Sequence, residues 1–313
     1  MNTVISYNLR LSQNHHWSLI GFDGTHQWLQ KLSTILMLKQ SHQYYKNRIY
    51  YFQNKVEDSS LENILIKIQK TMDEQPPMDG WYNINLRKLT LWHHPFHNST
   101  ICILHENQNK ILEYSQMYSS LRPVYETIIT QGGFPLHGAF AVKENMGVIL
   151  AAPSGTGKST CSKRFPHPWN SLCDDEIVLV KQNVGFVGHP FPTWSNFITG
   201  QSNNPFNIQK KAPISSVFFL EQGSRDEFNP VSTAEAAVRL CEASLQICKS
   251  RVRCYDIDKK KKLNQQIFSN AYIMAKTLPC FVLRATLDGC FWEHIEKVLS
   301  KNNYLCIQDK YKS

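Results

Sequence analysis

The stretch "LAAPSGTGKSTCSKRF", residues 150–165, decides the fold of this chain. Its core, residues 152–159, follows the pattern of a phosphate-binding loop, with Ala152 where such loops usually begin with glycine. The apolar run 148–151 before it predicts a buried strand, and residues 159–165 predict a short helix. A loop between a buried strand and a helix presents successive backbone N–H groups to a polyphosphate. The sequence therefore predicts a nucleotide site.

Each residue type in this loop suits one part of a magnesium–nucleotide complex. Gly155 and Gly157 permit backbone conformations and a close approach that side chains would obstruct. Lys158 can bridge the outer phosphates, and the Ser159 hydroxyl can ligate Mg²⁺. ATP and Mg²⁺ are the expected cofactors, with GTP in place of ATP left open. The residues predicted to contact the nucleotide are Ala152, Pro153, Ser154, Gly155, Thr156, Gly157, Lys158, Ser159 and Thr160.

A pair of acidic residues follows the loop at an unusually short distance. Asp174 and Asp175 end a short apolar run, and 174 − 158 gives only 16 residues from Lys158 to the first of them. Carboxylates in such a place can hold a metal or accept a proton. Most phosphate-loop NTPases insert at least one longer helix and a further strand before their acidic strand. The short gap therefore predicts a compact catalytic core.

These segments resemble a known family. "LHGAFAV", "GVILAAPSGTGKST" and "SLCDDEIVLV" resemble the catalytic domain of HPr kinase/phosphorylase over residues 130–195 and, more distantly, ATP-dependent phosphoenolpyruvate carboxykinase. The later segments "GHPFPTWS", "SSVFFLEQG" and "LPCFVLR" look more like divergent members found beside peptide-modification genes. Those members include kinases of lasso-peptide clusters and the SynChlorMet cassette protein ScmC.

The resemblance implies an α/β fold in two parts. Residues 126–313 would form an HPr kinase-like P-loop domain with a mixed sheet, and residues 1–125 a smaller α+β lobe of unknown role. The implied activity is transfer of the γ-phosphoryl group of ATP to a Ser or Thr hydroxyl of a protein or ribosomal peptide. The resemblance also implies homo-oligomers, although no interface is recognisable in the sequence.

The same resemblance assigns roles to four residues. Lys158 would contact the β- and γ-phosphates, and His137, from the "HG" of the preceding strand, would lie beside the aspartates. One aspartate would act as general base and the other would help Ser159 to hold the metal; we favour Asp175 as the base and Asp174 as the metal ligand. The Arg-containing C-terminal signature of HPr kinase/phosphorylases is not evident, which puts dephosphorylation of phosphoserine in doubt.

Two other functions stay open from the sequence. A non-catalytic accessory protein could bind the nucleotide to assemble a peptide-modifying complex. A small-molecule kinase could instead phosphorylate free serine or a carboxylic acid.

Composition restricts the location and the partners. No window of 18 apolar residues exists, so we expect no membrane association, and the alternating N-terminal residues do not suggest a signal peptide. Nine cysteines without a CxxC pair favour buried, reduced thiols in the cytoplasm. Lys and Arg exceed Asp and Glu by 34 − 25 = 9, but the basic residues are diffuse, so we expect no nucleic-acid partner.

Other segments predict individual elements. Residues 26–40 predict a helix, and residues 60–72 predict a helix or a strand. Residues 99–115 predict a strand, a turn and a second strand. Residues 232–250 predict a helix capped by Ser232, and the lysines at 259–262 predict a solvated loop.

Overall fold

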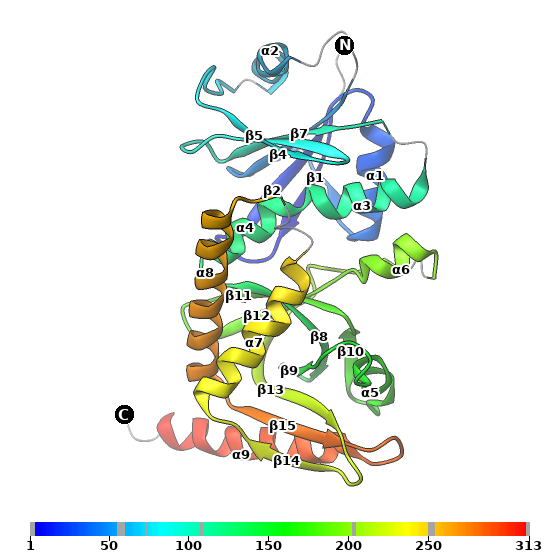
Figure 1. Cartoon of the computed structure of the whole chain (residues 1–313), viewed down its shortest axis with the longest axis vertical. Coiled ribbons are helices and arrows are strands. Elements are labelled where there is room, and N and C mark those ends of the chain that lie inside the picture. Colours follow the sequence, from blue (N-terminus) through cyan, green and yellow to red (C-terminus); the bar gives the residue numbers. More distant parts are fainter. Residues whose placement is uncertain are drawn as a thin grey trace. The chain divides into compact units, whose positions relative to one another are not determined.

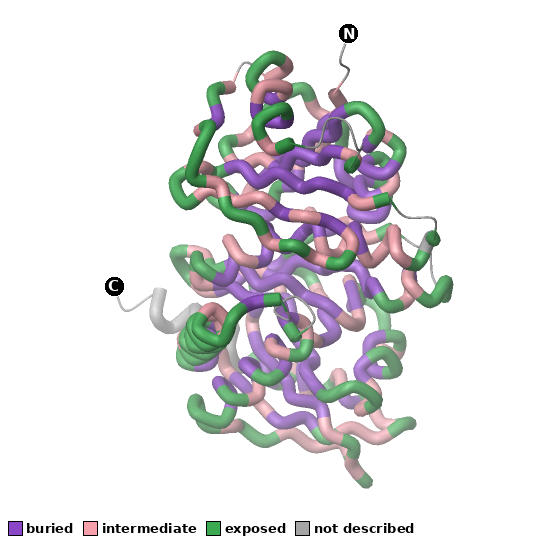
Figure 2. The backbone as a smooth tube through the Cα atoms, turned by 45° about the horizontal axis from the view of Figure 1, so that its top comes forward, coloured by how far each residue is buried: buried purple, intermediate pink, exposed green. Residues whose placement is uncertain are grey.

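The computed structural model describes residues 4–54, 60–72, 74–106, 109–201, 205–249 and 254–310. They divide into two compact units, one of residues 1–127 with 194–209 and one of residues 128–193 with 210–313. Each unit contains its own mixed sheet, so the chain is a mixed α/β protein (Figure 1). In Figure 2 the buried residues follow the strands of both sheets.

The first unit is built on a seven-stranded sheet of order β3-β1-β2-β4-β7-β6-β5. Its strands pair in parallel at β2–β4 and β4–β7 and antiparallel elsewhere. The strands are β1 (Ile5–Arg10), β2 (His16–Gly21), β3 (Lys39–Gln40), β4 (Arg48–Gln53), β5 (Tyr82–Leu86), β6 (Leu89–His93) and β7 (Ser99–Leu104). The helices are α1 (His26–Ile35), α2 (Leu61–Met72), α3 (Lys110–Ser120) and α6 (Trp194–Thr199), and α4 (Arg122–Thr130) contains the boundary between the units.

Two predictions for this unit have clear outcomes. Residues 61–72 form a helix, not a strand, because Ile64, Leu65 and Ile68 lie on one helical face and are buried against the sheet core. The predicted strand after β7 is wrong: those residues belong to α3. Asn109 caps this helix by accepting a hydrogen bond from the Ile111 amide at 2.8 Å.

The second unit contains an eight-stranded mixed sheet. Its strands are β8 (Phe134–Lys143), β9 (Met146–Ala151), β10 (Asn170–Cys173), β11 (Glu176–Lys181), β12 (Phe186–Phe191), β13 (Ala212–Gln222), β14 (Glu227–Pro230) and β15 (Cys280–Ala285). Its helices are α5 (Lys158–Arg164), α7 (Thr233–Cys248), α8 (Ile257–Thr277) and α9 (Phe291–Lys310). The strand before the loop and the helix after it are therefore confirmed as β9 and α5.

Five strands of this sheet form a closed ring, and β8 is the strand that closes it. The first half of β8, Phe134–His137, pairs with β11, and its second half, Gly138–Lys143, pairs with β9. The remaining pairs β9–β13, β13–β12 and β12–β11 complete the ring. The buried ring of Phe140 lies against Gly147 and Gly188, where a Cβ atom would approach it to 2.7 and 3.0 Å. Two glycines thus make room for one phenylalanine.

Gly147→Ala is expected to lower the free energy of unfolding by about 1–3 kcal/mol, as overpacking of a filled core does. The added methyl would meet Phe140 and also the Pro213 carbonyl oxygen at 2.9 Å, and the backbone atom cannot move aside. Chemical denaturation of the whole chain measures the change. Glu144→Gly in the same hairpin is the control, because Glu144 is exposed at φ +56° and its replacement should change stability little. Equal losses in both variants would contradict the packing explanation.

Helices α7 and α8 lie side by side in the second unit (Figure 1). Ser232 caps α7 as predicted, accepting from the Glu235 amide at 3.2 Å. The loop predicted for residues 259–262 is wrong: these lysines form the start of α8, which Asp256 caps through the Lys259 amide at 2.7 Å. Buried Asn270 on α8 donates to the carbonyl oxygens of Ile129 and Gly133, both at 2.8 Å, and so secures the entry to β8.

One face of β9 packs against helices α5 and α9. Val148 and Leu150 point to this side and share a core cluster with Cys161 of α5 and Phe291 of α9. The prediction of buried thiols is confirmed for six cysteines, while Cys254 and Cys290 are exposed. In the described part of the chain, no helix combines the length and apolar character needed to cross a membrane.

Candidate functional site

The glycine loop, residues 152–157, connects β9 to α5. Gly155 has φ +82° and Gly157, directly before α5, has φ +112°. A Cβ atom on either would meet nothing within 4 Å. These glycines are therefore required by the left-handed path of the backbone and not by crowding.

Ala152 departs from the usual first glycine, and the structure gives a reason. Its side chain is 7% exposed and belongs to the core cluster that contains Leu150 and Cys161. Its methyl group therefore packs into the core beneath the loop, where an alanine is accommodated.

Lys158 lies at the start of α5 and is 6% exposed. Its Nζ donates to the carbonyl oxygens of Ala152 at 2.8 Å and Pro153 at 3.0 Å, so the side chain folds back over the loop. Burial lowers the pKa of Lys158 below its ordinary value, and the nearby carboxylates of Asp175 and Asp174 partly oppose that shift. The ammonium group is thus held between the loop and the acidic pair.

His137 on β8 connects the glycine loop with the acidic pair. Its Nδ1 lies 3.1 Å from Oδ1 of Asp175 and 3.1 Å from the Asp175 main-chain oxygen, and its Nε2 lies 3.5 Å from Oγ of Ser154. With the proton on Nδ1, the imidazole donates to Asp175 and accepts from the Ser154 hydroxyl. The Gly138 amide also donates to the Asp175 main-chain oxygen at 3.0 Å. Residues 137, 154 and 175, far apart in sequence, therefore meet at one point.

Asp174 and Asp175 form the bend between β10 and β11, and both are half-buried. The Oγ1 of Thr193 donates to Oδ1 of Asp174 at 3.4 Å. Thr193 was not singled out in the sequence, because the contact depends on β12 returning beside β11. The two aspartates are consequently fixed differently, Asp175 by His137 and Asp174 by Thr193.

Ser159 and Thr160 are exposed in the first turn of α5. The hydroxyl of Ser159 and the carboxylate of Asp174 are oxygen donors of the kind that Mg²⁺ prefers. Within the described residues, no group of three or more His, Cys, Asp or Glu side chains is arranged to hold a metal. Mg²⁺ is often bound by one or two protein oxygens together with substrate phosphates, and this donor set fits that manner of binding.

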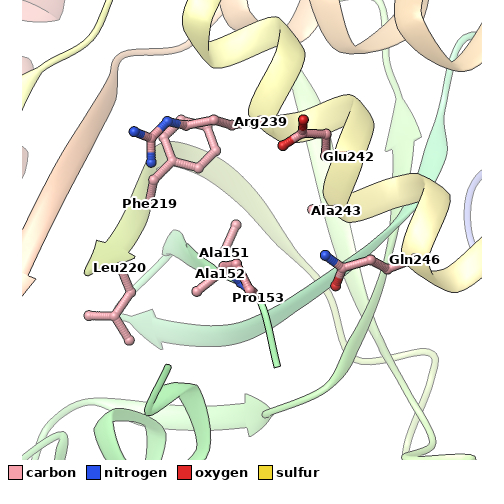
Figure 3. Close-up of a pocket in the computed structure, with 9 residues that line it drawn as sticks. All are labelled: Ala151, Ala152, Pro153, Phe219, Leu220, Arg239, Glu242, Ala243 and Gln246. Atoms are coloured by element: carbon pink, nitrogen blue, oxygen red, sulfur yellow. The ribbon is translucent and has the colours of Figure 1, made fainter. Parts of the chain in front are cut away.

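Two pockets of the second unit adjoin the glycine loop. The α7 pocket, about 300 Å³, lies between Ala152 and Pro153, β13 and α7, and Glu242 and Gln246 project from α7 toward it (Figure 3). The guanidinium group of Arg239 lies over the Phe219 ring at 5.5 Å and pairs with Glu221 and Glu235.

The α5 pocket, about 420 Å³, begins at residues 155–157 and extends along α5 to the ends of β13 and β15. Neither pocket could be located in the sequence, because the residues of their walls are far apart in the chain, from 151 to 246 in the α7 pocket and from 155 to 287 in the α5 pocket. The apolar runs that form β13 and β15 were the available signal, but only the strand order brings their ends together.

A protein-family model agrees with the sequence resemblance. The family model of the SynChlorMet cassette protein ScmC matches residues 100–300, more than half of the chain. Among solved structures, the Hpr(Ser) kinase/phosphatase from Coxiella burnetii is similar at 13% sequence identity and a TM-score of 0.30, covering 57% of this chain and 94% of that one. No curated protein matches the chain. On the extent of the family match, the chain belongs to the family of the SynChlorMet cassette protein ScmC.

Proposed function

We propose that the chain is an ATP-dependent kinase that transfers the γ-phosphoryl group of Mg·ATP to a Ser or Thr hydroxyl of a protein or ribosomally made peptide. The observation that carries this proposal is the bridge made by His137 between Ser154 of the glycine loop and the Asp175 carboxylate. It supports the proposal because the loop that would bind the phosphates and the carboxylate that would accept the proton belong to one hydrogen-bonded group. Phosphoryl transfer needs mainly positioning and charge neutralisation, and both are supplied here.

The loop and Lys158 would bind the phosphates. Backbone N–H groups of residues 154–158 would donate to the phosphate oxygens. The Lys158 ammonium, now bonded to two loop carbonyl oxygens, would exchange them for charged phosphate oxygens, which are stronger acceptors. Ser159 and Asp174 would hold Mg²⁺, which when bound neutralises charge on the phosphates.

Asp175 would act as the general base. One of its carboxylate oxygens accepts from His137, and the other would accept the proton of the acceptor hydroxyl. As that hydroxyl oxygen forms its bond to the γ-phosphorus, the bond from the γ-phosphorus to the bridging oxygen breaks and ADP leaves. His137 is a positioning residue here, because its Nδ1–H fixes the orientation of the carboxylate.

The test is transfer of labelled γ-phosphate from ATP by the purified full chain. Peptides with Ser or Thr, matched peptides with Ala, and free serine are the acceptors offered. Labelling of the Ser or Thr peptides supports the proposal, and labelling of free serine alone would show a small-molecule kinase instead. A chain that binds no Mg·ATP would contradict the proposal altogether.

His137→Gln is expected to lower turnover by roughly 10–100-fold, because a positioning contact to the base is lost. ATP affinity should change little, since the contact from His137 to the loop is a single long hydrogen bond to Ser154. ADP release measures turnover, and calorimetric titration measures affinity. His167→Gln, at an exposed position of the same unit, is the matched control. Unchanged turnover in His137→Gln would remove this residue from the mechanism.

A further inference from the structure

Three neighbouring strands of the second unit, β9, β13 and β15, are parallel, so their carboxyl ends lie at the same edge of the sheet. β9 pairs with β13 up to Ala151, and β13 pairs with β15 up to Gln222 and Ala285. In sheets of this kind, ligands bind in the crevice at the carboxyl ends of the strands. The α5 pocket lies at this edge, lined by Gln222 and Ala285 together with the glycine loop.

The α5 pocket begins at residues 155–157, the end of the glycine loop that leads into α5. Gly157, Thr160 and Arg164 form its wall along α5, whereas the Lys158 ammonium lies at the other end of the loop, on Ala152 and Pro153. A polyphosphate that reaches from the α5 pocket across the loop would therefore place its outer phosphate toward Lys158 and Asp175. The part of the ligand beyond the inner phosphate would lie in the pocket.

The lining of the pocket is amphipathic. Leu220 and Cys161 supply buried apolar surface, while Thr160, Thr286 and Gln222 supply hydroxyl and amide groups. The volume of about 420 Å³ lies in the range of small-ligand sites. A flat base needs the apolar surface, and a ribose needs hydrogen-bonding groups.

The rim of the pocket is a loop held on both sides, residues 286–289. Arg164 donates to the carbonyl oxygen of Thr286 at 2.9 Å and to that of Gly289. Asp226 accepts from the backbone N–H of Thr286 at 2.7 Å and from its hydroxyl at 2.9 Å. Leu287 in this loop lines the pocket and is nevertheless 77% exposed. A fixed loop thus presents an uncovered apolar side chain at the entrance.

We propose that the α5 pocket binds the nucleoside part of the nucleoside triphosphate, with Leu287 covering the base. This assignment rests on the proposed function, which places the phosphates in the glycine loop. The α7 pocket is the alternative site, and charge does not separate the two, because Arg239 and Glu242 line the α7 pocket as Arg164 and Glu221 line the α5 pocket. The α7 pocket suits the nucleoside less well because of its position. It adjoins Ala152 and Pro153, the end of the loop where Lys158 is held.

The test compares ATP with inorganic tripolyphosphate, which has the phosphates but no nucleoside. Leu287→Asn is expected to weaken ATP binding by about tenfold and to leave tripolyphosphate binding unchanged, because only the nucleoside contacts this side chain. Val184→Asn is the matched control, since Val184 is 92% exposed and does not line the pocket. Gln246→Ala probes the α7 pocket in the same way. Calorimetric titration of each full-length variant gives both affinities.

Each outcome separates this assignment from the proposed function. If the unchanged chain binds both ligands and Leu287→Asn leaves both affinities intact, the nucleoside lies elsewhere and only this assignment is overturned. A selective loss of ATP affinity in Gln246→Ala would overturn it in favour of the α7 pocket. Equal losses of both ligands in Leu287→Asn would place this residue at the phosphates and also overturn it. If neither ligand binds the unchanged chain, the proposed function fails as well.

Discussion

Asp175→Asn is expected to lower the turnover of Mg·ATP by about 10²–10⁴-fold, the usual loss when a general base is removed. Asparagine keeps the size of the side chain and can still contact His137, which lies 3.1 Å from Oδ1 of Asp175, but it cannot accept the proton of an acceptor hydroxyl. ATP affinity should stay within about threefold, because the phosphates are assigned to the loop and Lys158. Turnover and affinity are measured as ADP release and calorimetric binding.

Asp174→Asn is the matched comparison, because the two residues are neighbours in one bend. Its main effect should be a higher Mg²⁺ concentration for half-maximal turnover, since Asp174 is assigned to the metal. If the two variants showed these effects in reverse, the roles of the two aspartates would be exchanged. If neither variant changed turnover while ATP still bound, the chain would be a nucleotide-binding accessory protein.

Lys158→Met is expected to weaken ATP binding by 100-fold or more, because it removes the buried ammonium assigned to the outer phosphates. It should also raise the melting temperature of the ligand-free chain by roughly 2–4 °C, equivalent to about 1 kcal/mol. The reason is that burial lowers the pKa of Lys158, so the folded state disfavours the charged form. Methionine has a similar length and carries no charge.

The sign of this effect gives a pH test. With the pKa of Lys158 lower in the folded than in the unfolded chain, its destabilising effect is complete below the folded pKa and disappears as the pH rises toward 10.5, the ordinary pKa of lysine. The difference in melting temperature between Lys158→Met and the unchanged chain should therefore shrink as the pH approaches that value. Lys163→Met, at an exposed position of the same helix, is the control and should show neither effect. A lower melting temperature in Lys158→Met would contradict the burial argument.

The elements around the glycine loop could be predicted because their signals are local. An apolar run, two glycines and a following helix are all contained in residues 146–164, and the structure has β9 and α5 there. The two wrong predictions also concern local patterns. Asn109 was a capping signal for α3, but the apolar residues that follow it led to the prediction of a strand. In α8 the lysine run concealed the helical spacing of Ile267, Ala271 and Met274.

The assembly of the site could be predicted only in part. The family resemblance placed His137 beside the aspartates, but its contact with Ser154 depends on the pairing of β8 with both β9 and β11. Thr193 and the walls of both pockets likewise depend on strand order and on the placement of α7. Such long-range pairing has no signature in a single sequence, because register is decided by contacts between distant segments.

The double pairing of β8 makes the correct register of one strand a condition for chemistry. His137 is opposite Glu176 on β11, and the next residue, Gly138, is opposite Ala151 on β9. A slip of one residue would turn every side chain of β8 to its other face and remove the imidazole from both Ser154 and Asp175. Misregistered chains would then be inert, not partly active. The specific activity of a preparation should therefore be proportional to the fraction of chains in which β8 has the correct register.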